Sequence, residues 1–268
     1  NGDLNIQTGS ELYCNNLAGT GYLTSFYGAV INNDGSIIGT GANSKFGFYG
    51  SVAQTYSGAG TFGTAISPFG NLGIEILNSN NVTLNAPVYA IRFNLVNGSF
   101  INSNQITIGN GLTGTVQVGG GGVGLDAGTF DSYPVLNTGS SYIIRYETAN
   151  AITTGLEVPA SRTATTVLSN NPTGTTLSGG DMIVNSIQLF QGSYDIVANS
   201  LIIKAAITRT GGNISAASGT VEMNGTANQT IPANTFLNDD LLNIIITNTA
   251  GGTTQVTLGG AVNLYGDL

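Results

Sequence analysis

The sequence predicts an all-β protein, specifically a parallel β-helix (β-solenoid) built from tandem modules. Two observations lead to this prediction. Only 7% of the 268 residues are charged and 40 are glycine, whereas charged residues make up about a quarter of a usual globular chain. The chain also repeats itself at long range. Long charged side chains cover most helical proteins, so their replacement by Asn, Thr, Ser and Gly favours strands whose turns carry the polar surface.

The clearest repeat joins "FGFYGSVAQTYSGAGTF" to "VEMNGTANQTIPANTF". Gln54 in the first stretch and Gln229 in the second lie 175 positions apart, as do Gly50 and Gly225. A single deletion aligns the rest of the two stretches. Because the same residues recur ahead of a "VTL" strand, we expect them to form the corner of a coil rather than a binding site.

A second repeated element follows the first, anchored on Leu84, Leu177 and Leu258. Its other recurring parts are Gly-Ser at 98–99 and 192–193, and Gly-Asp-Leu at 2–4 and 266–268. These repeats predict roughly three modules of about 80 to 95 residues each. Because the chain starts and stops at one phase of the repeat, we expect the modules to continue beyond both chain ends.

Within the modules, hydrophobic and polar residues alternate over short runs such as "GIEILN", "QITIGN" and "NIIITN". Turn residues separate these runs about every 8 to 12 positions, which indicates many short strands. A string of β-sandwich modules is the alternative, but such modules would show a block of seven strands with hairpin dipeptides. Repeated coil-length units therefore favour the solenoid.

The predicted solenoid modules cover 1–118 and 161–268. The stretch 119–160 departs from the repeat, with a run of four glycines and three tyrosines. Because the repeat breaks there, we predict an irregular insertion or a loop projecting from the stack. Insertions in solenoids project from the stack and often form the binding face. An irregular structural coil is the alternative.

The candidate catalytic chemistry is limited to carboxylates. The chain has no histidine, which excludes Ser-His-Asp and Cys-His nucleophiles and zinc sites with His ligands. A glycosidase would need two carboxylates about 5 to 10 Å apart. The candidate pairs are Asp126 with Asp131 and Asp239 with Asp240. A polysaccharide lyase would want a basic residue near bound calcium, and the basic residues near acidic ones in the sequence are Arg145 and Arg162. We expect no catalytic residues and no enzyme.

Neither a metal site nor a cofactor is predicted. Asn238, Asp239 and Asp240 in "LNDDLLN" offer hard oxygen ligands, yet the spaced Asp/Asn-Gly pattern of a calcium loop is absent. We expect a solvated turn there, and calcium binding stays open as the alternative. The single Cys14 has no Cys or His at ligand spacing, and it is predicted to be a small buried apolar side chain.

An aromatic cluster at Tyr133, Tyr142 and Tyr146 offers rings that could stack on sugars, the alternative being core or corner packing. A carbohydrate-binding or carbohydrate-cleaving β-helix protein is therefore the second function class. Ice binding would need a regular Thr-x-Thr row, and the threonines are too irregular to support it.

The charge distribution excludes two kinds of partner. The 6 basic residues are scattered and the net charge is −8. Nucleic acid and anionic membrane surfaces bind clustered Lys and Arg, so we expect neither as a partner. No run of about 18 apolar residues is present, so we expect no membrane-spanning helix.

The string "GTVEMNGTANQTIPANTF", followed by "LLNIIITNTAGG" and "VTLGGAVNLYGDL", resembles the long repeat regions of secreted cell-surface proteins of Bacteroidota, the group that exports adhesins through the type IX secretion system. The residues that carry the resemblance are Gly225, Gln229, Thr230, Ile231, Pro232, Leu242, Ile244, Ile246, Asn248, Val256, Thr257, Leu258, Val262 and Gly266. Residues 119–150 fall outside it.

This resemblance implies an extracellular, cell-surface protein of the gliding or attachment adhesin type. The chain would be a structural and adhesive segment of a filament or stalk that mediates attachment or surface motility without catalysis. The implied partners are extracellular surfaces or polysaccharides, neighbouring repeats of the same chain, and the type IX secretion machinery during export.

Overall fold

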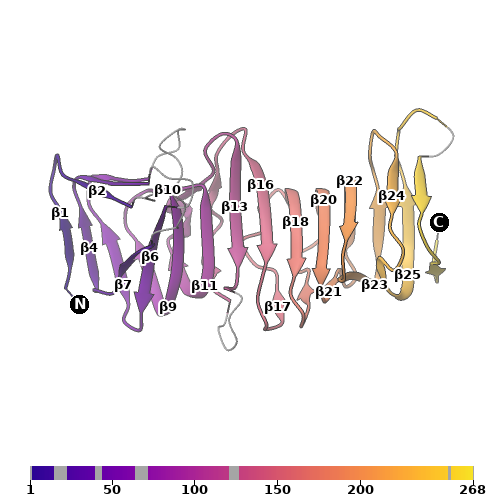
Figure 1. The fold of residues 1–268 in the computed structure, drawn as a ribbon, viewed down its shortest axis with the longest axis horizontal. Coiled ribbons are helices and arrows are strands. Elements are labelled where there is room, and N and C mark those ends of the chain that lie inside the picture. Colours follow the sequence, from indigo (N-terminus) through magenta and orange to yellow (C-terminus); the bar gives the residue numbers. More distant parts are fainter. Residues whose placement is uncertain are drawn as a thin grey trace. The chain divides into compact units, whose positions relative to one another are not determined.

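The computed structural model describes residues 2–14, 23–39, 44–63, 72–120, 127–252 and 255–267. These residues form a parallel β-solenoid of about ten turns, and the described part of the chain contains no α-helix. The predicted all-β solenoid is therefore confirmed. Neighbouring strands come from successive coils and run parallel (Figure 1), which rules out the alternative of antiparallel β-sandwich modules.

The described residues divide into two compact units, 2–120 with 127–142, and 143–267. In the first unit each coil has three sides. One side holds β1 (Leu4–Ile6), β4 (Val30–Asn33), β7 (Gln54–Ser57), the second halves of β9 (Gly73–Leu84) and β11 (Arg92–Ile101), and β14 (Thr129–Phe130). A second side holds β2 (Glu11–Tyr13), β5 (Ser36–Ile38), β8 (Thr61–Phe62), β10 (Val88–Ala90), β12 (Ile106–Ile108) and β15 (Val135–Leu136).

The third side of the first unit carries the polar cluster described below. It holds β3 (Leu23–Phe26), β6 (Lys45–Gly50), the first halves of β9 and β11, and β13 (Thr113–Val118). Strands β9 and β11 are long enough to turn the corner between two sides. A short 3-10 helix, η1 (Ser103–Gln105), lies at the next corner.

The second unit has shorter coils. Its longest side holds most of β16 (Ser141–Tyr146), then β18 (Thr163–Asn170), β20 (Met182–Gln191), β22 (Ser200–Arg209), and the second halves of β23 (Asn213–Met223) and β25 (Phe236–Ile246). The other strands are β17 (Ile152–Thr153), β19 (Thr175–Thr176), β21 (Ser193–Asp195), β24 (Gln229–Ile231), β26 (Val256–Leu258) and β27 (Asn263–Leu264). Met182 lies beside Leu201, and Ser200 lies beside Thr220, so one coil takes about 20 residues.

The two units fill their interiors differently. The core of the first unit is aromatic, with ring centroids 5.1 Å apart for Phe46 and Phe62 and 5.7 Å apart for Phe48 and Phe100. The core of the second unit is mainly aliphatic. One buried ladder there runs through paired positions of four strands, namely Met182, Leu201, Val221 and Ile244. In both units, burial of these columns of apolar side chains supplies the main driving force for stacking.

The repeated Gly-Ser dipeptides are corners of the coil. Gly98 and Gly192 both have left-handed φ values, +85° and +64°. A Cβ on Gly98 would lie 2.0 Å from the carbonyl oxygen of Asn78, and one on Gly192 would lie 1.9 Å from that of Asn171. Each glycine thus lets its corner rest on the backbone of the coil before it, which no side chain would allow.

Residues 127–160 correct the prediction of a projecting loop between 119 and 160. In the first unit, β14 and β15 pair with β11 and β12, and in the second, β16 and β17 pair with β18 and β19. The described part of this stretch is therefore irregular structural coil. Its sequence lacks the repeat motif but keeps the alternation of a strand, with Tyr142, Ile144 and Tyr146 buried. Residues 121–126 lie outside the described residues.

Replacing Gly192 with alanine tests the corner role. We expect Gly192→Ala to destabilise the chain by more than about 1 kcal/mol, because both the left-handed backbone and the contact with Asn171 oppose a Cβ. Far-UV circular dichroism during thermal unfolding measures the effect. Gly251→Ala is the matched control, since Gly251 has no atom within 4 Å of the added Cβ. Equal melting temperatures for the two variants would contradict this account.

Candidate functional site

Gln54, the most conspicuous repeated polar residue in the first unit, lies inside the coil. Its Nε2 donates to the carbonyl oxygens of Phe26 at 3.2 Å and Gly28 at 2.8 Å. Its Oε1 accepts a 2.8 Å hydrogen bond from Nδ2 of Asn78. The side chain is buried. Gln54 therefore connects the corner of the preceding coil to an asparagine of the next one.

Gln229 repeats this arrangement in the second unit. Its Nε2 donates to the carbonyl oxygens of Ile203 and Ala205, each at 3.0 Å, and its Oε1 accepts from Nδ2 of Asn248 at 2.7 Å. Each glutamine thus bonds to at least two backbone carbonyls and one asparagine amide, although the sequences around the two glutamines differ. The prediction that this repeat forms the corner of a coil is confirmed.

Asp131, a candidate catalytic carboxylate, caps the 3-10 helix of the preceding coil. Its carboxylate accepts from the backbone N–H groups of Asn102 and Ser103, each at 2.9 Å, and from the Ser103 hydroxyl at 2.7 Å. Partial burial acts to raise its pKa, but these hydrogen bonds and one from Ser132 outweigh it and lower the pKa to about 2. Its predicted partner Asp126 lies outside the described residues. Asp131 therefore has a structural task at a corner.

The second candidate pair, Asp239 and Asp240, lies inside β25, at an irregularity of the strand where Asp239 has a left-handed φ of 63°. The Asp240 carboxylate accepts from Asn263 Nδ2 at 3.2 Å and from the Tyr265 hydroxyl at 3.0 Å. Among the described residues, no three His, Cys, Asp or Glu side chains come together as ligands of a metal ion would. The prediction of a turn ahead of the strand is therefore corrected: these residues form a bulge within β25, where the register with β23 shifts.

The three tyrosines predicted to cluster do not form a shared exposed surface. Tyr133 is 45% exposed, whereas Tyr142 and Tyr146 are 5% and 0% exposed. The alternation of β16 turns the last two inward, so they are core residues. Cys14 is also buried, as predicted, and burial raises the pKa of its thiol.

The two arginines proposed as neighbours of acidic groups have different partners. Arg145 in β16 forms an ion pair with Glu147, which directly follows that strand. The Arg162 guanidinium instead donates to backbone carbonyls, those of Ser178 and Gly180 at 2.7 Å and Asp181 at 3.1 Å. Arg162 thus fastens one corner of the second unit.

Glu157 is a buried carboxyl that the sequence did not single out. Its Oε1 accepts from the Tyr146 hydroxyl at 2.9 Å and from the Gly155 N–H at 2.8 Å. Burial raises the pKa of Glu157 despite these hydrogen bonds, because an enclosed site disfavours the charged form. The group therefore belongs to the polar packing inside the second unit.

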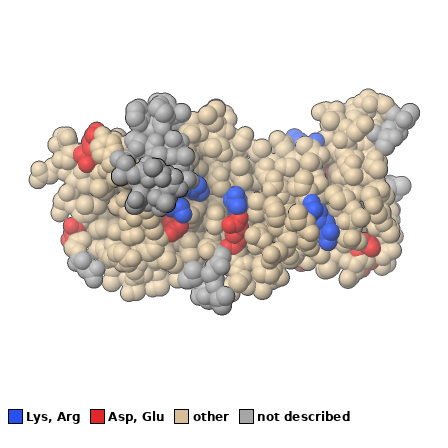
Figure 2. Space-filling view, in the orientation of Figure 1, with Lys and Arg blue, Asp and Glu red and all other residues tan. Residues whose placement is uncertain are grey.

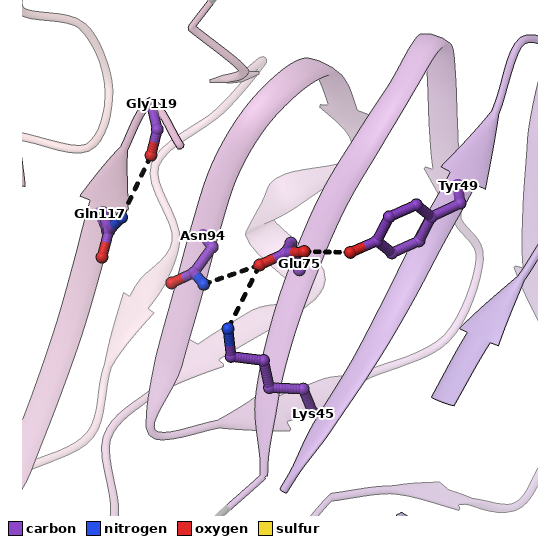
Figure 3. A network of polar contacts seen from close by, with 6 residues as sticks. All are labelled: Lys45, Tyr49, Glu75, Asn94, Gln117 and Gly119. Carbon is purple, nitrogen blue, oxygen red and sulfur yellow. Dashed lines mark hydrogen bonds and ion pairs between the residues drawn. The ribbon is translucent and has the colours of Figure 1, made fainter. Parts of the chain in front are cut away.

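A polar cluster lies on the third side of the first unit, around the carboxylate of Glu75 (Figure 3). Tyr49 donates a short hydrogen bond to its Oε1. Its Oε2 accepts from Asn94 Nδ2 at 3.0 Å and lies 3.4 Å from Lys45 Nζ. We call these four residues the Glu75 cluster. They come from β6, β9 and β11.

Strand register explains how the Glu75 cluster forms. Glu75 lies beside Gly47 on one side and Asn94 on the other. A Cβ on Gly47 would lie 2.0 Å from the Tyr49 ring, so the missing side chain makes room for that ring to fold toward Glu75. On the next strand, Gln117 pairs with Asn94 in register, and its amide donates to the Gly119 carbonyl at 3.2 Å instead.

The electrostatics of the cluster keep Glu75 ionised. Burial acts to raise its pKa, but hydrogen bonds from Tyr49 and Asn94 and the charge of Lys45 outweigh burial, so the pKa is lowered. Burial, followed by the bond to this carboxylate, raises the pKa of Tyr49. Because every partner of Glu75 in the cluster is a donor and only 14% of its side chain is exposed, the carboxylate clamps three strands together.

Charged side chains are sparse on the face shown in Figure 2, where short patches of either sign are separated by uncharged surface. Among the described residues, no helix has the length and apolar character needed to cross a membrane. Comparisons with protein-family models, curated proteins and solved structures found no match.

Replacing Gln229 tests whether the repeated glutamine holds the corner. We expect Gln229→Leu to destabilise the chain by about 1–3 kcal/mol, because two carbonyls and the Asn248 amide lose a buried partner. Gln54→Leu should cost a similar amount. Urea unfolding followed by circular dichroism measures both. The control is Gln7→Leu at an exposed position; a loss as large in the control as in the corner variants would argue against the corner role.

The pH dependence of stability tests Asp131. Its pKa is lowered on folding, so the ionised carboxylate stabilises the folded chain above about pH 4, and this contribution is lost as the pH falls toward 2. Asp131→Asn should therefore lower stability at pH 6 by about 1 kcal/mol or less, since the site is largely exposed. The difference should shrink as the pH falls below about 4 and vanish only below about pH 2, measured by chemical unfolding against Asp267→Asn. A pH-independent difference would show that the carboxylate charge is irrelevant.

Proposed function

We propose that the chain is a structural and adhesive segment of a secreted cell-surface filament or stalk, which mediates attachment or surface motility without catalysis. The observation that carries this proposal is the use made of the repeated residues. The repeated residues join one coil to the next. Gln54 and Gln229 do so by hydrogen bonds, and Gly98 and Gly192 do so by close backbone contact. Selection for a repeated corner preserves length and stiffness, which are the properties of a scaffold.

The C-terminal part of the second unit supports stacking with further repeats. An apolar cavity of about 240 Å³ there is lined by Ile244, Ile246, Leu258 and Leu264, among others. A further coil of the same kind would cover these side chains, as the coils within each unit cover one another. The cavity fits the proposal that neighbouring repeats of this type stack into a longer filament.

The cellular part of the proposal rests on the motif resemblance described above. On that resemblance, we propose that the chain lies at the cell surface after export by the type IX secretion machinery. Protease treatment of intact native cells, with and without that machinery, tests this part: the chain should be cleaved only when export is intact.

A bead-retention assay tests the adhesive role. Beads coated with the folded chain should stay on polysaccharide-coated surfaces under flow at least several times longer than beads coated with the heat-unfolded chain. A parallel assay for new reducing ends should detect none. Retention equal to that of the unfolded chain would overturn the adhesive role, and steady release of reducing ends would overturn the non-catalytic one.

A further inference from the structure

Two adjoining cavities lie along one corner of the second unit, where β16, β18, β20 and β22 end. The first has a volume of about 240 Å³ and includes Glu147, Asn170 and Gln191 in its lining. The second has a volume of about 230 Å³ and includes Gln188, Phe190 and Arg209. Because Phe190 lines one cavity and the next residue, Gln191, lines the other, the two cavities adjoin along β20. We call the two together the corner groove.

Strand register builds the corner groove. Ser169 lies beside Leu189, and Leu189 lies beside Arg209, so the last residues of successive strands form a row across coils. A register shift after Ser169 then places Asn170 beside Gln191. The groove therefore crosses from coil to coil, and a ligand lying in it would touch several coils at once.

The groove offers polar groups that other described parts of the chain do not use. The side-chain amides of Asn170, Gln188 and Gln191 have no hydrogen-bond partner among the described residues. Nε of Arg209 is buried and also lacks a partner there. Phe190 is 39% exposed, an aromatic ring at the join of the two cavities.

We propose that the corner groove binds a linear, uncharged polysaccharide. Amides both donate and accept hydrogen bonds, which matches the hydroxyl groups of a sugar, and the Phe190 ring offers an apolar face for a pyranose ring. This inference rests on the adhesive role proposed above and names the class of surface to which the chain attaches.

Other ligand classes fit the groove less well. Strands β18, β20 and β22 are paired with one another, so they offer no free edge to which a peptide strand could add. Glu147 is neutralised by Arg145, which leaves Arg209 as the one unpaired charge described in the groove. A single cation on a chain of net charge −8 gives little attraction for a polyanion.

Because the chain has no tryptophan, a single introduced indole reports on binding. Phe190→Trp in the whole purified chain is titrated with cellohexaose, chitohexaose, mannohexaose and an oligogalacturonate hexamer. We expect a saturable change in emission with at least one neutral hexasaccharide and a weaker response to the uronate. Tyr133→Trp, at the exposed tyrosine of the first unit, is the matched control and should not respond.

Phe190→Ala provides the second readout. It should weaken binding of the same sugar about three- to tenfold, while Tyr133→Ala should leave it unchanged and both variants should melt like the unaltered chain. Tighter binding of the uronate would overturn the neutral ligand class. If coated beads still adhere but Phe190→Ala does not weaken sugar binding, the corner groove is not the binding site and the adhesive role stands. If unaltered beads do not adhere, the adhesive role itself fails.

Discussion

The fold depends on satisfying backbone carbonyls at the corners of parallel coils. Strand pairing uses the polar groups along each side, but the chain bends away at every corner and leaves carbonyl oxygens without a strand partner. Buried carbonyls without a partner are costly. Gln54 and Gln229 meet this requirement with one side chain each, and Asn78 and Asn248 extend the link to the following coil. At these two corners the amides satisfy the carbonyls, so that the apolar columns can stack without a polar penalty.

Much of the fold could be predicted because the residues that satisfy the corner carbonyls recur in the sequence. The recurrence of Gln54 at Gln229, together with period-two apolar runs, is enough to predict parallel coils. The inward Tyr146 was harder to predict, because an aromatic residue in a stretch that lacks the repeat motif suits a loop as well as a core. The available signal was the alternation of side chains within β16, which places Tyr146 on the buried face.

The outward sites could not be predicted, because they depend on register between coils of unequal length. Lys45 and Glu75 lie 30 positions apart and Glu75 and Asn94 only 19, so no fixed spacing brings them together. The corner groove has the same origin: a single register shift after Ser169 sets Asn170 beside Gln191. Sequence periodicity specifies which residues face out, whereas coil length specifies which of them become neighbours.

The parallel pairing of coils also has a mechanical consequence. In the second unit, Met182 pairs with Leu201 and Ser200 with Thr220, so each coil stores about 20 residues within one strand spacing of about 4.8 Å. A pull along the stack that detached one coil would release about 60 Å of extended chain. Neighbouring coils would keep their own corner amides and apolar columns. A tether built this way would therefore lengthen in steps under load, because coils detach one at a time while the others stay folded.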